Sequence, residues 1–212
     1  MEETGGETQS PEPVPRIIGL TGGIGSGKST VAQFIEAMGF PIYYSDVRAK
    51  DIVNDDNALK MKIIELLGEN AYNPDGQYNR KWVASQVFEN NALLSDLNTL
   101  IHPAVKVDFE QWVTQQTTEL VFKETALLFE LNLDQNCYKS ILITAEDNLR
   151  IKRVMDRDGK TYREVEAIMN QQMPEKDKIR KADYIIYNNG GLPELQSETE
   201  RTIHQLIQEI EA

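Results

Sequence analysis

The segment Gly22–Thr30 carries residues well suited to phosphate chemistry. It fills every fixed position of the pattern G-x-x-x-x-G-K-[ST], and a loop of this kind wraps the phosphates of a nucleotide. Its glycines let backbone N–H groups approach phosphate oxygens, while Lys28 adds positive charge and Ser29 offers a hydroxyl to Mg²⁺. The alternative is a glycine-rich turn that happens to precede a helix. The complete motif favours a nucleotide site made by Gly23, Gly25, Ser26, Gly27, Lys28, Ser29 and Thr30.

Two acidic residues follow apolar segments that are typical of strands. Asp46 comes after residues 41–44, and Glu124 lies near the end of an apolar run that begins at Val121. Ligands of open α/β sheets gather at the carboxyl ends of the strands. We therefore expect Asp46 to face the γ-phosphate, where it accepts a proton from an attacking hydroxyl or helps to hold Mg²⁺. An N-cap on the helix through Ile52 is another role for Asp46, and both roles can coexist. Glu124 is expected to orient hydrated Mg²⁺.

Positive charge is concentrated between residues 150 and 163. Six basic residues stand there against two acidic ones, in a chain of net charge −12. Arg150, Arg153 and Arg157 recur at helical spacing, so we expect them to share one face. Pointed at the phosphate loop, that face would supply the cationic lid that phosphoryl transfer requires. A solvated helix face is the alternative.

The elements that must position these residues alternate between strand and helix. Apolar runs at residues 17–20, 41–44, 121–125, 141–144 and 185–187 predict strands. This alternation predicts an α/β fold with a parallel, doubly wound five-stranded sheet. From residue 57 to about residue 113 the pattern is helical, and it predicts an inserted domain that holds a second substrate. We expect a helix break at His102–Pro103, because a helix rarely continues through the residue before a proline.

Size and composition limit the class of protein. A chain of 212 residues is long enough for one sizeable core with a small subdomain. The negative net charge argues against general nucleic-acid binding, and the absence of an apolar run of about 20 residues argues against a membrane span. The single cysteine, Cys137, fits a reducing compartment. Residues 1–15 hold four acidic residues and three prolines, so we predict a disordered extension there.

Together these segments resemble the dephospho-CoA kinase family. The resemblance runs in order from about residue 16 to the C-terminus. It is carried by Leu20–Thr30, Ser45–Asp46, Asp75–Gly76 with Arg80, Leu97–Pro103, Leu127–Glu130, Arg157–Asp158 and Ala182–Gly190. The phosphate loop alone indicates only a nucleotide site, whereas Ile101-His102-Pro103 and Leu127-Leu128-Phe129-Glu130 make the match specific.

The resemblance implies a three-layer P-loop kinase. It would comprise a core at 16–56 and 118–212, a helical CoA-binding insertion at about 57–117 and a helical lid at about 148–175. Such an enzyme transfers the γ-phosphoryl group of ATP, with Mg²⁺, to the ribose 3′-hydroxyl of dephospho-CoA. We expect it in the cytoplasm, as a monomer or weak homo-oligomer. A kinase of another small nucleoside or nucleotide, and a non-catalytic nucleotide-binding module, are the alternatives.

The resemblance also implies roles for particular residues. The catalytic group comprises Lys28, Asp46, Arg153 and Arg157. Asp46, Arg80, His102 and Glu130 are expected to contact the acceptor. A structural role is the alternative for His102, and a cap on the following turn is the alternative for Glu130. Asn189 and Gly190 lie in a loop at the carboxyl end of the last predicted strand, and we expect its backbone to pack on adenine; a plain turn is the alternative. Ser29 and Glu124 are expected to hold the metal, Glu124 directly or through water. Three residues depart from the family pattern, namely Tyr44 and Glu124, which stand where aspartates are common, and Ala126, which replaces a proline.

Overall fold

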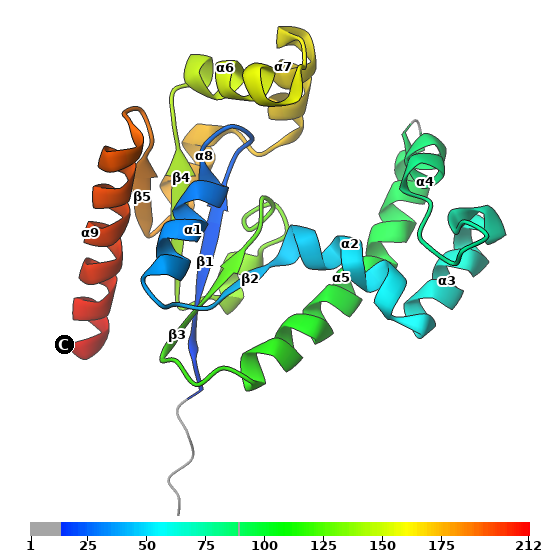
Figure 1. Cartoon of the computed structure of the whole chain (residues 1–212), viewed down its shortest axis with the longest axis horizontal. Helices are drawn as coiled ribbons and strands as arrows, with labels where there is room; N and C mark the ends of the chain where they lie inside the picture. The colour runs from blue at the N-terminus through cyan, green and yellow to red at the C-terminus, as the bar shows by residue number, and fades with distance from the viewer. Residues whose placement is uncertain (1–13, 89) are drawn as a thin grey trace, which may run out of the picture.

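A parallel five-stranded sheet forms the centre of the computed structural model, which describes residues 14–88 and 90–212 (Figure 1). Its strands are β1 (Arg16–Gly22), β2 (Ile42–Tyr44), β3 (Leu120–Glu124), β4 (Lys139–Thr144) and β5 (Tyr184–Tyr187). They stand in the order β2-β3-β1-β4-β5, and every neighbouring pair is parallel. The predicted α/β fold and its five strands are therefore confirmed. Most of the predicted extension, residues 1–13, lies outside the described residues.

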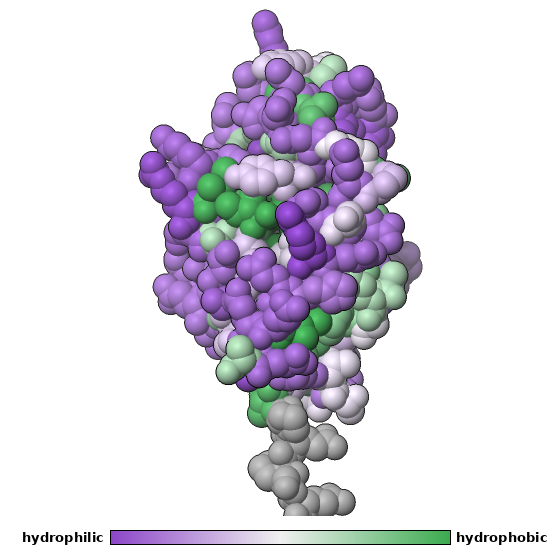
Figure 2. All heavy atoms as spheres, turned by 90° about the vertical axis from the view of Figure 1, so that its left-hand side faces the viewer, coloured by the Kyte–Doolittle hydropathy of each residue, from purple (hydrophilic) through white to green (hydrophobic). Residues whose placement is uncertain are grey.

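Helices cover both faces of this sheet. Helices α1 (Lys28–Ala37) and α9 (Leu192–Glu211) pack on one face, where Ile18, Leu20 and Ile203 are fully buried. The C-terminal half of α5 (Asn91–Thr114) packs on the other face through Phe109 and Val113. The surface on the side of α9 is mainly hydrophilic, with small apolar areas (Figure 2), as expected for a helix with one buried face.

A second apolar cluster lies beside the sheet, in the helical region. It joins α2 (Ser45–Asp55), α3 (Asn57–Leu67), the 3₁₀ turn η1 (Glu69–Ala71), α4 (Arg80–Val87) and the first half of α5. Ile52 and Val53 of α2 belong to this cluster, and the Tyr72 hydroxyl donates a hydrogen bond to the Val53 carbonyl at 2.7 Å. The packed unit therefore begins on α2, upstream of the expected limit at residue 57.

Helix α5 is continuous, so the predicted break at His102–Pro103 is wrong. Pro103 lies inside the helix, where it lacks an N–H donor and costs roughly 3 kcal/mol relative to alanine. Buried residues on both sides of Pro103 hold the helix in two different cores, Leu97 in the helical cluster and Phe109 against the sheet. The packing of both halves of α5 outweighs the unfavourable effect of a proline inside a helix.

Three further helices stand near the carboxyl ends of the strands. Helices α6 (Asp147–Asp158) and α7 (Tyr162–Gln171) lie above that end of the sheet (Figure 1). They share a small core of Ile151, Val154 and Val165, and α8 (Glu175–Lys181) leads back to β5. The other short element is the 3₁₀ turn η2 (Leu133–Asn136). Within residues 14–88 and 90–212, no helix combines the length and apolarity needed to cross a bilayer.

Candidate active site

The phosphate loop lies between the end of β1 and the start of α1, where it lines a cavity of about 900 Å³. Gly25 and Gly27 adopt positive φ angles of 77° and 96°, which only glycine adopts without strain. Gly27 is the N-cap of α1 and Lys28 is its first residue. Unsatisfied N–H groups and the positive end of the helix dipole therefore face the cavity. The residues predicted from Gly23 to Thr30 all line it.

Lys28, Glu124 and Asp46 meet in this cavity. The Lys28 ammonium forms an ion pair with Glu124 Oε1, and Asp46 Oδ2 lies 3.6 Å from the same nitrogen. They come together because β1, β2 and β3 are parallel neighbours whose carboxyl ends share one edge of the sheet. Burial raises the pKa of the Glu124 carboxyl, and the neighbouring Lys28 opposes that rise.

The Asp46 carboxylate is held in the cavity wall by two long hydrogen bonds. The Ala126 N–H donates to Oδ2 at 3.3 Å, and the Thr125 hydroxyl donates to Oδ1 at 3.5 Å. Tyr44 is the N-cap of α2, and Asp46 in its first turn makes no capping bond. The N-cap role for Asp46 is therefore wrong, and its carboxylate remains available to a ligand.

The donor set of this cavity fits Mg²⁺ bound together with a nucleotide. Among the described residues, no three His, Cys, Asp or Glu side chains form a metal cage. Mg²⁺ usually takes one or two carboxylates, water and substrate phosphates instead. Ser29, Asp46 and Glu124 all line the cavity and supply oxygen donors of that kind.

The three arginines of the basic helix α6 lie in two different places, two at the cavity and one behind the phosphate loop. Arg153 and Arg157 line the cavity, where Arg153 Nη2 donates to the Asn188 carbonyl at 3.0 Å and Arg157 pairs with Asp158. The buried guanidinium of Arg150 donates instead to the Ile24 carbonyl at 3.1 Å and pairs with Glu175 at 3.0 Å. The expectation that all three arginines face the phosphates is therefore wrong for Arg150. It holds the phosphate loop from behind.

Two residues that hydrogen-bond to the phosphate loop had no role assigned from the sequence: Asn188, although it lies in the segment Ala182–Gly190 that carries the resemblance, and Gln172. Asn188 Nδ2 donates to the Ser26 carbonyl at 2.8 Å, and Gln172 Oε1 accepts from the Ile24 N–H at 3.0 Å. Both line the cavity. Asn188 follows β5 directly, so the strand-end rule could have singled it out. No local signal marks Gln172, which reaches the loop from the far end of α7.

Four of the predicted site residues do not line the cavity, namely Arg80, His102, Glu130 and Asn189. Asn189 accepts a hydrogen bond from the Glu146 N–H at 2.9 Å, although the adjacent Gly190 lines the cavity. Arg80 begins α4 and donates to the Lys50 carbonyl at 2.8 Å. His102 is exposed on α5. Glu130 accepts from the Met173 N–H at 3.0 Å and pairs with the buried Lys178 at 3.1 Å. Their predicted roles stay predictions.

Comparison with known proteins agrees with this geometry. A family model described as dephospho-CoA kinase matches residues 16–194. The dephospho-CoA kinase of Fusobacterium nucleatum is 35% identical over 185 residues, which cover 87% of this chain and 95% of the relative. That of Chlorobaculum tepidum is also 35% identical, over 93% of this chain and 98% of the relative.

Solved structures show the same fold. A Thermus thermophilus crystal structure has a TM-score of 0.80 at 32% identity and covers 92% of this chain and 97% of that one. The dephospho-CoA kinase of Campylobacter jejuni has a TM-score of 0.62 at 24% identity, with 91% and 97% covered. Because the family model matches residues 16–194, which is most of this chain, the chain belongs to the dephospho-CoA kinase family.

Proposed function

We propose that this chain transfers the γ-phosphoryl group of ATP to the ribose 3′-hydroxyl of dephospho-CoA, yielding CoA and ADP, with Asp46 as the acceptor-side carboxylate. The observation that carries the proposal is the meeting of Lys28, Glu124 and Asp46 beside a complete phosphate loop. Simple nucleotide binding would not require the second carboxylate. This step completes coenzyme A synthesis.

The phosphate loop binds the donor nucleotide. Backbone N–H groups from Gly23 to Thr30 and the N-terminus of α1 cradle the phosphates. Lys28 neutralises charge on the β- and γ-phosphates. Its present carboxylate partners hold the ammonium in the cavity until phosphate oxygens replace them. The loop at Asn189–Gly190 packs near the adenine.

Asp46 acts on the acceptor. The 3′-hydroxyl oxygen attacks the γ-phosphorus, the bond from that phosphorus to the β–γ bridging oxygen breaks, and the hydroxyl proton passes to the Asp46 carboxylate. The side chain is 46% exposed, so a substrate hydroxyl can reach it. The helical insertion, with Arg80 and His102, holds the rest of the acceptor.

Ser29, Glu124 and Asp46 would hold Mg²⁺ with the nucleotide. When bound, the ion neutralises charge on the β- and γ-phosphate oxygens. Arg153 and Arg157 close over the transferred group and exclude water. The reducing environment suggested by the free Cys137 supports a cytoplasmic location, and we propose a monomer or weak homo-oligomer.

Transfer of labelled phosphate from ATP to dephospho-CoA tests the proposal. The wild-type chain should label dephospho-CoA, and Asp46→Asn should lower kcat by roughly 10²-fold or more, as expected for loss of a general base. Full kcat in Asp46→Asn would remove Asp46 from the proton step. Preferential labelling of another nucleoside or nucleotide would reassign the acceptor. No ATP turnover with any acceptor would indicate a non-catalytic module.

A further inference from the structure

Lys50 is a cation in the wall of the active-site cavity, on the same helix as Asp46. Both residues line the cavity, and they are four positions apart on α2. Residues at this spacing share a helix face and are separated by about 6 Å along the axis. The cavity therefore presents a carboxylate and an ammonium one helical turn apart.

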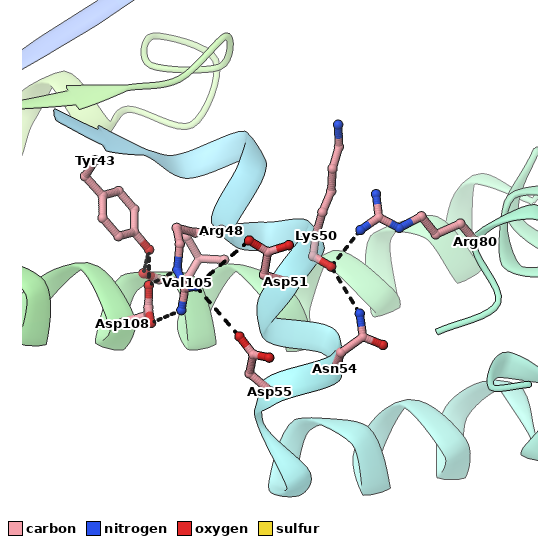
Figure 3. Close-up of polar contacts among 9 residues, drawn as sticks. All are labelled: Tyr43, Arg48, Lys50, Asp51, Asn54, Asp55, Arg80, Val105 and Asp108. Atoms are coloured by element: carbon pink, nitrogen blue, oxygen red, sulfur yellow. Dashed lines mark hydrogen bonds and ion pairs between the residues drawn. The ribbon is translucent and has the colours of Figure 1, made fainter. Parts of the chain in front are cut away.

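The partners of Lys50 differ sharply from those of Arg48 on the same helix. Arg48 lies within ion-pair distance of Asp51, Asp55 and Asp108, at 4.0, 3.7 and 2.7 Å. Among the described residues, no hydrogen bond or ion pair engages the Lys50 ammonium. Figure 3 shows the Lys50 side chain extending away from the Arg48 cluster. Arg48 is thus neutralised within the fold, whereas Lys50 is not.

A second cation stands beside Lys50. Arg80 Nη2 donates to the Lys50 carbonyl at 2.8 Å, which fixes the start of α4 against α2 (Figure 3). No ion pair of Arg80 occurs within residues 14–88 and 90–212. An anion that reaches both side chains would therefore meet two cations that the described part of the fold leaves without a counter-charge. In a chain of net charge −12, this pairing is notable.

We infer that Lys50, with Arg80 beside it, binds the diphosphate of the acceptor. The inference rests on the proposed function. In dephospho-CoA the diphosphate is attached to the 5′ carbon of the same ribose whose 3′-hydroxyl reacts. When that hydroxyl lies at Asp46, the diphosphate lies one sugar ring away, and Lys50 lies one helical turn from Asp46. A flexible ammonium and a planar guanidinium together suit a diphosphate, which offers oxygens on two phosphorus atoms.

This arrangement also gives the enzyme a way to select its acceptor. A nucleoside without a 5′-phosphate leaves both cations unsatisfied, so it loses the charge-assisted hydrogen bonds that dephospho-CoA makes. Binding energy from the diphosphate, remote from the reacting oxygen, then serves to orient the 3′-hydroxyl against Asp46. Lys50 is therefore a specificity-determining residue that contacts substrate.

Steady-state kinetics of Lys50→Ala test the inference. At saturating ATP, the KM for dephospho-CoA should rise about tenfold, the scale of a lost charge-assisted hydrogen bond at an exposed site. The KM for ATP should stay unchanged and kcat should change by less than about threefold, because the contact is made before and during transfer alike. Lys50→Arg should restore most of the affinity, and Lys50→Glu should weaken it beyond Lys50→Ala.

Ionic strength and a control lysine complete the test. The wild-type KM for dephospho-CoA should rise more steeply with salt than that of Lys50→Ala. Lys62→Ala is the matched control, since Lys62 is an exposed lysine of the neighbouring α3 that lines a different cavity; it should behave as wild type. An unchanged KM for dephospho-CoA in Lys50→Ala, or an equal rise in the KM for ATP, would overturn the inference while the wild type remains active. A wild type that cannot phosphorylate dephospho-CoA would overturn the proposed function and this inference together.

Discussion

Arg48 and Asp108 form a two-point ion pair that joins α2 to α5. Arg48 Nη2 donates to Asp108 Oδ1 at 2.7 Å and Nε donates to Oδ2 at 3.0 Å. The Tyr43 hydroxyl donates to the same Oδ2 at 2.6 Å (Figure 3). The Asp108 carboxylate, on the long helix α5, therefore joins that helix to β2 through Tyr43 and to α2, which carries Asp46, through Arg48.

Asp108→Asn should lower the free energy of unfolding at neutral pH by about 1 kcal/mol. The loss is modest because Arg48 is partly exposed, so solvent screens the ion pair. The Arg48 and Tyr43 donors lower the pKa of Asp108. The ion pair therefore stabilises the folded chain fully at pH values above the ordinary carboxyl pKa. That stabilisation is lost as the pH falls through the lower pKa that Asp108 has in the folded chain. Urea unfolding should show a deficit at about pH 7 that shrinks below about pH 4. An equal deficit at both pH values would contradict this account.

Glu124 should control the acid limb of the pH–rate profile. Burial raises its pKa, so its carboxylate is protonated at a higher pH than an ordinary glutamate, and activity should fall as the pH drops through that raised value. The profile of kcat/KM for ATP reports this group in the free enzyme.

Glu124→Gln should remove that limb and lower kcat/KM by about 10- to 100-fold, as for loss of a group that orients a metal. Glu119→Gln provides the control, because Glu119 precedes β3 at the opposite end from Glu124 and pairs with Arg16. Persistence of the limb in Glu124→Gln would assign it to another acid.

Residues at strand ends were predictable, and residues placed by tertiary packing were not. Glu124 ends β3, while Lys28 and Asp46 follow the neighbouring parallel strands β1 and β2, so sheet topology brings the three together. Helical spacing predicted a common face for Arg150 and Arg153, but spacing does not tell how deeply each side chain is buried or which element it contacts. Arg150 lies near the start of α6, against the phosphate loop, whereas Arg153 lies one turn on, at the cavity.

The pair formed by Glu130 and Lys178 should govern stability more than acceptor binding. Lys178 is fully buried, and Glu130 also accepts from the Met173 N–H just after α7. Glu130→Gln leaves a buried ammonium without its counter-charge, which should cost about 3–5 kcal/mol in the free energy of unfolding. Replacing both residues, as Glu130→Gln with Lys178→Met, should recover much of that loss. Denaturant unfolding of the wild type and of these two variants measures both differences.

The same variants test the substrate role predicted for Glu130. Because Glu130 does not line the cavity, the double variant should keep the wild-type KM for dephospho-CoA once it is folded. A large rise in that KM, with stability restored, would instead place Glu130 at the acceptor.

Pro103→Ala should stabilise the protein, because α5 is held together in spite of this residue. Alanine restores the N–H that a helix interior uses and removes a cost of roughly 3 kcal/mol, less about 1 kcal/mol for the greater freedom of the unfolded chain. Pro103 is exposed and lines the same cavity as Lys62, so shortening it to alanine leaves no void in the core. A net gain of about 1–2 kcal/mol in the free energy of unfolding, measured with urea, is therefore expected. Pro74→Ala is the contrasting control, since Pro74 sits in the turn closed by the Gly76 N–H and the Asn73 carbonyl at 2.8 Å, where proline suits the backbone; it should lose stability. If Pro103→Ala instead destabilises the chain, the proline itself contributes to the path of α5 that lets its two halves reach separate cores.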